Sequence, residues 1–169
     1  MIIFRSSQLV TNHCDGVDLN CGCPQGWAQK EGIGACLINN PKFVSDVVKQ
    51  TRNQCTDNLG VSVKIRIHSD IERYIRFKKN RSYFKWFRII LRNECICSPP
   101  FDIPFRTVDL CRQIEAAGAS YITVHGRRKD QRGDPVNLEA IKTIKQSLQI
   151  PVVANGDICT LEDAKRVKR

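Results

Sequence analysis

Reactive and polar side chains stand where four hydrophobic, β-prone segments of this sequence end. They are Asn20, Cys23, Lys64, Arg66, His125 and the run Asn155-Gly156-Asp157. A thiol can attack an electrophile or donate a proton, and an amine, a guanidinium or an imidazole can hold an anion. The carboxyl ends of parallel strands meet at one edge of a sheet, where a β/α barrel carries its active site. We therefore expect these residues to form one site.

Cys21 and Cys23 form a C-x-C pair that allows two interpretations. The pair could bind a metal together with Cys14 or Cys36. Zinc sites, however, usually combine two C-x₂₋₄-C pairs, or one such pair with two histidines, and the three histidines here lie far apart in the sequence. We expect no metal, and we favour Cys23 as a reactive thiol in a glycine-rich turn.

The segment Val61–Ile67 places Ser62, Lys64 and Arg66 on one face, because successive side chains of a strand point to opposite sides. Cations without a partner are costly to bury. Either the segment is a solvated edge strand, or its two cations face an anionic ligand. A Schiff-base role for Lys64, as in an aldolase, is a third option that requires neither Arg66 nor Cys23.

The elements that must position these residues alternate along the chain. Strands are predicted at Val17–Asn20, Val61–Ile67, Tyr121–His125 and Pro151–Asn155. Helices are predicted from Asn40 and Pro41, from a Thr107 cap to Gly118, over 138–148, and after a capping box of Thr160 and Asp163. This alternation predicts an α/β protein with a parallel sheet covered by helices.

One interval between the predicted strands is too long for a regular repeat. Residues 74–106 hold eight of the chain's twelve aromatic residues, and eight Lys or Arg against two acidic residues. Without them the interval resembles the one that follows. We therefore predict a first part of the domain at 1–73, a basic aromatic insertion at 74–106 and the remainder at 107–169. The insertion is either an RNA-binding arm or the product of a translated intron or a faulty gene prediction.

Composition sets broad limits on what the chain can be. It has 169 residues, of which 41% are hydrophobic and 26% charged, as is typical of a globular protein. No run approaches the roughly 18 apolar residues of a membrane span, and residues 1–8 do not resemble a signal peptide. We expect the nine cysteines to be thiols in the cytoplasm or nucleus. The net charge of +10 suggests a nucleic-acid partner, although most of it lies in 74–106.

Several motifs together resemble the tRNA-dihydrouridine synthase family, and their order along the chain is the order of that family. The matching segments are Asp18–Pro24, Gly34–Leu37, Val63–Arg66, His125–Arg127 and Ile150–Ile158. The sequences of the first two segments are most similar to the eukaryotic branch that modifies uridines 20a and 20b. The resemblance covers the chain except for residues 74–106.

The resemblance implies a partial TIM-type (β/α)₈ barrel of about four βα units that binds FMN. It implies reduction of a tRNA uridine to dihydrouridine with NADPH as reductant, hydride passing from FMNH₂ to C6 and a proton passing from Cys23 to C5. It assigns contacts with FMN to Lys64, His125, Asn155, Gly156 and Asp157, and contacts with the substrate to Asn20, Arg66 and Arg127.

Two positions depart from the family pattern. Arg128 stands where the family usually has threonine, and Gly26 stands where the most similar relatives have arginine. Both changes concern contacts with the substrate more than contacts with flavin. Because four βα units do not close a barrel, we expect weak activity or none from the chain as it stands. A catalytically inactive, RNA-associated product remains the alternative, and the oligomeric state is open.

Overall fold

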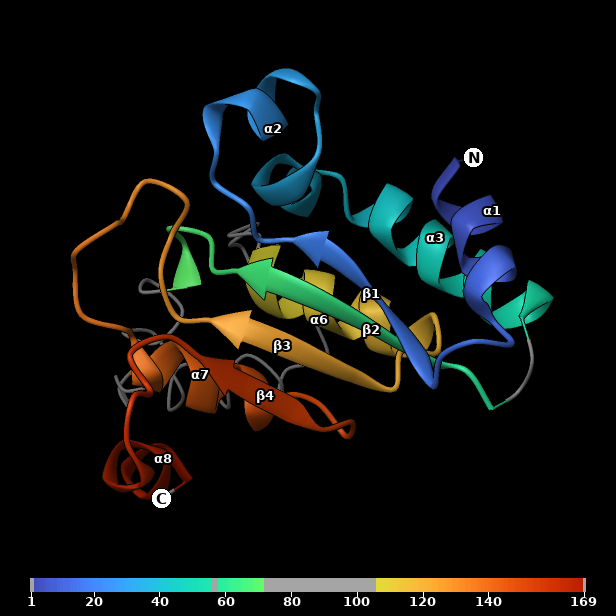
Figure 1. Cartoon of the computed structure of the whole chain (residues 1–169). Helices are drawn as coiled ribbons and strands as arrows, with labels where there is room; N and C mark the ends of the chain where they lie inside the picture. Colours follow the sequence, from blue (N-terminus) through green and yellow to red (C-terminus); the bar gives the residue numbers. More distant parts are fainter. Residues whose placement is uncertain (1, 56–57, 72–105, 169) are drawn as a thin grey trace, which may run out of the picture.

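Four parallel strands, in the sequence order β1-β2-β3-β4, form one sheet at the centre of the fold (Figure 1). Their bounds are β1 Gly16–Cys21, β2 Gly60–Arg66, β3 Tyr121–His125 and β4 Val152–Asn155. The α/β class and the four predicted strands are therefore confirmed, with ends that differ by only one residue. The computed structural model describes residues 2–55, 58–71 and 106–168, so the predicted insertion, apart from Arg106, lies outside the described residues.

Among the described residues, helices cover one face of the sheet and none covers the other, which we call the open face (Figure 1). The helices are α1 Ile2–Val10, α2 Gly26–Lys30, η1 Gly34–Asn39, α3 Pro41–Gln54, α6 Arg106–Ala116, α7 Leu138–Lys145 and α8 Leu161–Lys168. Helices α3, α6 and α7 lie behind the sheet in this view, α1 lies beside α3, and α2 and η1 follow the end of β1. Within the described ranges, no helix combines the length and the apolar character needed to cross a membrane.

Side-chain caps explain where three of these helices begin. The Asn40 side chain accepts a hydrogen bond from the backbone N–H of Phe43 at 3.2 Å, and Pro41 opens α3. Thr160 and Asp163 exchange bonds before α8: the Thr160 hydroxyl accepts from the Asp163 N–H at 3.1 Å, and the Asp163 carboxylate accepts from the Thr160 N–H at 3.0 Å. Asn137, which the sequence analysis did not single out, caps α7 in the manner of Asn40.

The start of α6 differs from the prediction. The helix begins at Arg106, so Thr107 lies inside its first turn and is not its cap. The Thr107 hydroxyl instead accepts the backbone N–H of His68 at 3.0 Å, and the Asp70 carboxylate accepts the backbone N–H of Arg106 at 2.7 Å. These four residues form what we call the β2–α6 clasp, which joins the end of β2 to the start of α6. Gly118, with φ of +97°, ends this helical segment as predicted.

The core lies between the sheet and its helices. Val63 and Ile65 of β2 and Ile122 and Val124 of β3 are fully buried there. Burying each such side chain stabilises the fold by about 1.5–3 kcal/mol. Because β2 pairs with both β1 and β3, the interpretation of β2 as a solvated edge strand is wrong. The polar side chains of β2 instead point to the open face of the sheet.

Arg52 fastens the opposite, amino-terminal ends of the strands to α3. Its guanidinium donates hydrogen bonds to the carbonyls of Leu59 and Gly118, each at 2.7 Å, and to the hydroxyl of Ser120 at 2.6 Å. One α3 side chain thus fixes the residues just before β2 and β3, which helps to set the register of these strands.

Candidate active site

Strand register brings the predicted residues into two neighbouring rows on the open face of the sheet. Asn20 pairs with Lys64 across β1 and β2, and in the next row Arg66 pairs with His125, which in turn pairs with Asn155. Neighbouring strands lie about 4.8 Å apart, so residues in a row are direct neighbours. The predicted gathering of polar groups at the carboxyl ends of the strands is therefore present.

Cys23 lies in a turn that is held from several directions. The Asn20 amide oxygen accepts the backbone N–H of Gly22 at 3.0 Å, and Nε of Arg66 donates to the carbonyl of Gly22 at 2.9 Å. The backbone N–H of Ala35 donates to the carbonyl of Cys23 at 2.9 Å. A β-carbon on Gly34, whose φ is +63°, would lie 2.7 Å from that carbonyl oxygen, so only glycine fits there.

The two thiols of the C-x-C pair have different environments. Cys21 is fully buried on the helix side of the sheet, and burial, with a smaller effect of Asp18, raises its pKa to about 12. Cys23 is only half-buried. Of the two, Cys23 is thus the thiol that a ligand on the open face can reach.

The region around His125 is strongly cationic. Burial, followed by the charges of Arg66, Lys64 and Arg127, lowers the pKa of His125 to about 4, and Asp157 opposes this shift. Nε2 of His125 is buried and has no hydrogen-bond partner among the described residues. Lys64 has no hydrogen bond or ion pair within the described ranges, and its Nζ lies 3.7 Å from where a β-carbon on residue 22 would stand. The site therefore offers positive charge and a neutral imidazole to an anionic ligand.

The turn after β4 packs directly against this region. Arg127 forms an ion pair with Asp157, with NH2 2.7 Å from Oδ2, and its Nε donates to the carbonyl of Asp134. Asp157 has φ of +56° and Gly156 has φ of +112°, so both adopt the left-handed backbone conformation of a tight turn. The Asp157 carboxylate is thus already engaged by Arg127.

Metal binding finds no geometric support in the part of the chain that the structure describes. No group of three or more His, Cys, Asp or Glu side chains converges there, and the seven described cysteines are free thiols. Cys36 is half-buried, and Cys111 is fully buried.

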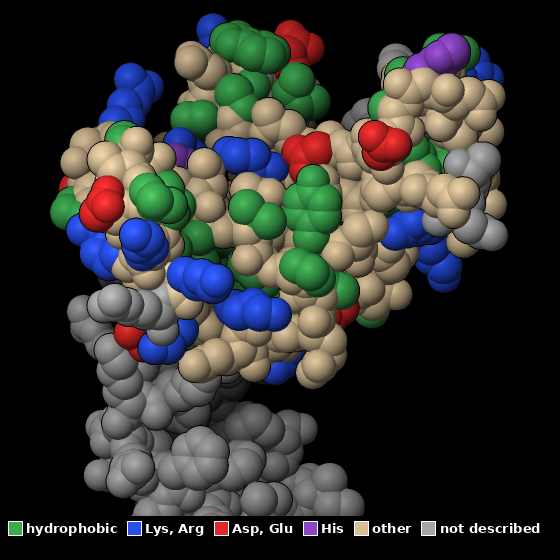
Figure 2. Space-filling view, turned by 60° about the horizontal axis from the view of Figure 1, so that its bottom comes forward, with side chains coloured by type: hydrophobic (Ala, Val, Ile, Leu, Met, Phe, Trp, Pro, Cys, Tyr) green, Lys and Arg blue, Asp and Glu red, His purple; other side chains and the backbone are tan. Residues whose placement is uncertain are grey.

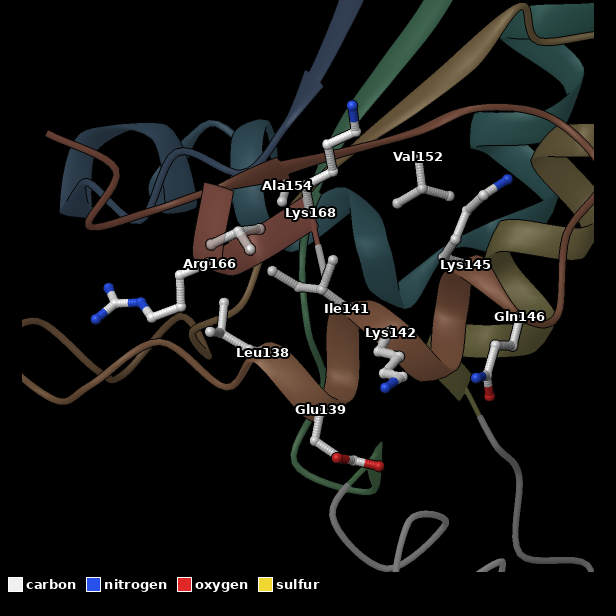
Figure 3. Close-up of a pocket in the computed structure, with 11 residues that line it drawn as sticks. Leu138, Glu139, Ile141, Lys142, Lys145, Gln146, Val152, Ala154, Arg166 and Lys168 are labelled. Atoms are coloured by element: carbon white, nitrogen blue, oxygen red, sulfur yellow. The ribbon is translucent and has the colours of Figure 1, made fainter. Parts of the chain in front are cut away.

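A groove of about 630 Å³ lies away from these residues, between α7, α8 and β4 (Figure 3). Leu138, Ile141, Val152 and Ala154 give it an apolar lining, and Lys and Arg side chains stand around it. Figure 3 shows the charged ends of these side chains pointing away from one another. They do not converge on a common anion, and the groove contains none of the predicted site residues.

The sequence predicted the cluster of polar residues, Gly156 among them, but missed two residues that shape it. Gly34 provides space beside Cys23, and Gln131 contacts Arg66 from the loop after β3. Gly34 opens one of the segments that resemble the family, which was the available signal for it. Nothing in the sequence indicates the contact of Gln131, because its backbone carbonyl accepts the bond.

The donor set fits a flavin mononucleotide. Its phosphate and its reduced ring are anionic, which suits the cations around His125, and the buried Nε2 of His125 is a polar atom in need of a partner.

A parallel sheet whose strands follow sequence order, with helices on one face and polar residues at the carboxyl ends of the strands, has the arrangement of a β/α-barrel segment. Residues 3–81 and 102–169 match the family described as Dihydrouridine synthase (Dus). The chain belongs to this dihydrouridine synthase family. Its four-stranded parallel sheet is consistent with part of a TIM-type barrel.

The chain is similar to curated tRNA-modifying proteins along nearly its whole length. It is 44% identical over 169 residues to a human protein named tRNA-dihydrouridine(20a/20b) synthase (NAD(P)+)-like, covering 99% of this chain and 43% of that protein. It is 34% identical over 170 residues to the Schizosaccharomyces pombe tRNA-dihydrouridine(20a/20b) synthase, covering 100% of this chain and 42% of that protein. It is 30% identical over 153 residues to the Escherichia coli tRNA-dihydrouridine(16) synthase, covering 89% of this chain and 38% of that protein. The chain thus spans about two fifths of the length of these relatives.

Proposed function

We propose that this chain carries the site of a tRNA-dihydrouridine synthase of the 20a/20b type, which reduces a uridine of the tRNA D-loop with FMN and NADPH. The observation that carries the proposal is that Lys64 and His125 lie in neighbouring rows on the open face of the sheet, with the turn that holds Cys23 bonded to Arg66 of the second row. The names of the human and yeast relatives support the substrate and the position.

Within this proposal, Lys64, His125 and the Asn155-Gly156-Asp157 turn hold FMN. FMN, when bound and reduced by NADPH, supplies the hydride that reaches C6 of the uracil. The Lys64 ammonium stabilises negative charge on the ligand beside it. His125 stays neutral at pH 7, so its buried Nε2 can exchange a hydrogen bond with the ligand without adding charge.

Cys23 is the proton donor to C5 of the uracil in this proposal. A cysteine thiol is mostly protonated at neutral pH and can act as a general acid. The thiolate left after proton transfer is close enough to Arg66 for their charges to interact favourably. A uridine within a folded tRNA must leave its stack to reach such a site, at a cost of a few kcal/mol.

Asn20, Arg66 and Arg127 are proposed to lie around the substrate base. Arg127 is held in place by Asp157, so it presents a fixed cation to the phosphates of a tRNA. On the face shown in Figure 2, Lys and Arg side chains are spread out with hydrophobic side chains between them. Charge on the described surface therefore supports tRNA as a partner only weakly, and the site residues carry the argument. With a tRNA substrate, the proposed enzyme would act in the cytoplasm or the nucleus.

The test is flavin binding by the full chain, followed by product formation. We expect the purified protein to show the visible absorption of FMN, and Lys64→Gln to weaken FMN binding at least tenfold. Lys165→Gln, which removes an exposed lysine of α8, is the matched control and should leave the dissociation constant unchanged. Dihydrouridine in tRNA, measured by mass spectrometry, then tests the reaction.

A colourless protein that forms no dihydrouridine would contradict the proposal. RNA binding by such a protein would favour the non-catalytic, RNA-associated alternative.

A further inference from the structure

Two hydrogen bonds hold Gly22, one on each of the two peptide groups that flank its α-carbon. Its N–H donates to the side chain of Asn20 at 3.0 Å, and its carbonyl accepts from Nε of Arg66 at 2.9 Å. Gly22 directly precedes Cys23, so the backbone dihedral angles between them determine where the Cys23 thiol points. Asn20 and Arg66, which hold Gly22, were both predicted to contact the substrate, yet their hydrogen bonds in the structure are made to the chain itself.

The guanidinium of Arg66 also reaches a second loop. Its NH1 donates to the carbonyl of Arg128 at 3.0 Å and to that of Gln131 at 3.4 Å. The Gln131 side chain in turn accepts the backbone N–H of Arg128 at 2.8 Å. This loop follows β3 and begins just after His125 and Arg127. Arg66 thus bridges the turn that carries Cys23 and the loop at 128–131.

We propose that Asn20 and Arg66 are positioning residues, which orient Cys23 by holding the peptide groups on either side of Gly22, and that Arg66 couples this turn to the loop at 128–131. The geometric part of the proposal stands on these contacts, and only its consequence for proton transfer rests on the proposed function.

Arginine is the residue that such a bridge requires. Its planar fork presents several N–H donors in fixed directions, so one side chain can bind two loops at once. Lysine keeps the charge but concentrates its donors on one atom. Arg66→Lys therefore removes the bridge while it preserves the electrostatics of the site, and a role of Arg66 through charge alone would survive this substitution.

Three variants of the full chain separate the contacts from one another, with protection of individual backbone amides measured by hydrogen exchange in NMR spectra. Asn20→Ala should reduce protection at residues 22 and 23 about tenfold and leave 128–131 unchanged. Gln131→Ala should reduce protection at 128–131 alone. Arg66→Lys should reduce protection in both places by about tenfold. Asn53→Ala and Arg166→Lys, which alter exposed helical side chains, are the matched controls and should change neither.

A functional readout distinguishes positioning from substrate binding. In protein that binds FMN, Arg66→Lys should slow the oxidation of reduced flavin by tRNA at least tenfold, while the dissociation constant for tRNA and the rate of flavin reduction by NADPH stay within twofold.

Unchanged protection at residues 22 and 23 in both Asn20→Ala and Arg66→Lys would overturn the proposal, and unchanged protection at 128–131 in Arg66→Lys would overturn the coupling. A weaker affinity for tRNA with an unchanged rate would assign Arg66 to substrate binding instead. The exchange measurements need neither flavin nor tRNA, so they decide the geometric part even if the proposed function fails. If Arg66→Lys does not fold, the other two variants still test the two halves of the contact network.

Discussion

The imidazole of His125 packs against Gly156 so closely that no side chain fits between them. A β-carbon on residue 156 would lie 2.9 Å from both Cδ2 and Nε2 of His125, and 2.7 Å from Cγ2 of Val136. Gly156 also has φ of +112°, which residues with side chains rarely adopt. The position of the histidine and the conformation of the turn after β4 therefore depend on each other.

Gly156→Ala should destabilise the protein and displace His125. Strain at this backbone conformation and the clash with His125 and Val136 together predict a loss of about 2–4 kcal/mol in the free energy of unfolding, measured by urea denaturation. Gly133→Ala is the matched control, because a β-carbon there meets nothing within 4 Å, and it should change stability by less than about 0.5 kcal/mol. Equal stability of the two variants would contradict the close packing.

The low pKa of His125 should make stability depend on pH. Because this pKa is about 4 in the folded protein, against an ordinary 6.5, the unfolded chain binds more protons between these values. The contribution of His125 to stability is therefore fully present above pH 6.5 and is lost as the pH falls toward 4. Denaturation curves at pH 7 and pH 5 should differ less in His125→Gln than in the original protein. His13→Gln, which changes an exposed histidine, should leave the difference intact.

Cys23→Ala should separate the two half-reactions of the proposed enzyme. Flavin reduction by NADPH does not use the thiol and should proceed at the original rate, whereas dihydrouridine formation should fall about 10²-fold or more, the typical contribution of a general acid. Stopped-flow absorbance and mass spectrometry of tRNA measure the two steps. Cys55→Ala, at the end of α3, is the control. Equal loss of both steps would refute the role of Cys23 as the acid.

Arg52→Ala should lower the free energy of unfolding by about 2–4 kcal/mol, since it removes charged hydrogen bonds and leaves the carbonyls of Leu59 and Gly118 without their donor. Arg52→Lys should recover only part of this loss, because one ammonium cannot reach all three acceptors. Urea denaturation provides the measurement, and Arg112→Ala, on the exposed side of α6, should have little effect. A loss in Arg52→Ala as small as that in Arg112→Ala would show that the contact adds nothing.

Local patterns were enough to predict most of the fold. Short β-prone segments that end in polar residues predicted all four strands, and the caps at Asn40 and at Thr160 with Asp163 were predicted correctly because capping is a contact within one helical turn. The same reasoning failed at Thr107, whose hydroxyl is used by His68 from β2. A contact with a residue distant in the sequence replaced the expected helix cap there, and the residues around Thr107 give no sign of that contact.

The candidate site was predictable in position but not in detail. Parallel strands place their carboxyl ends together, so Lys64 and His125 were expected at one edge of the sheet. The bonds of Arg66 to the carbonyls of Gly22 and Arg128 were not expected, because every residue has a carbonyl and the sequence cannot indicate which one a distant side chain selects.

The β2–α6 clasp has a consequence for how this protein can change over evolution. The Asp70 carboxylate accepts a hydrogen bond from the backbone N–H of Arg106 at 2.7 Å, although the two residues are 36 positions apart in the sequence. Because the entropy cost of closing a loop rises by only about 0.6 kcal/mol for each doubling of its length, the chain between them can be lengthened or shortened cheaply. The clasp therefore marks a point of the chain that tolerates insertions. A reporter or another domain inserted between Asp70 and Arg106 should leave the strands that carry Lys64 and His125 undisturbed.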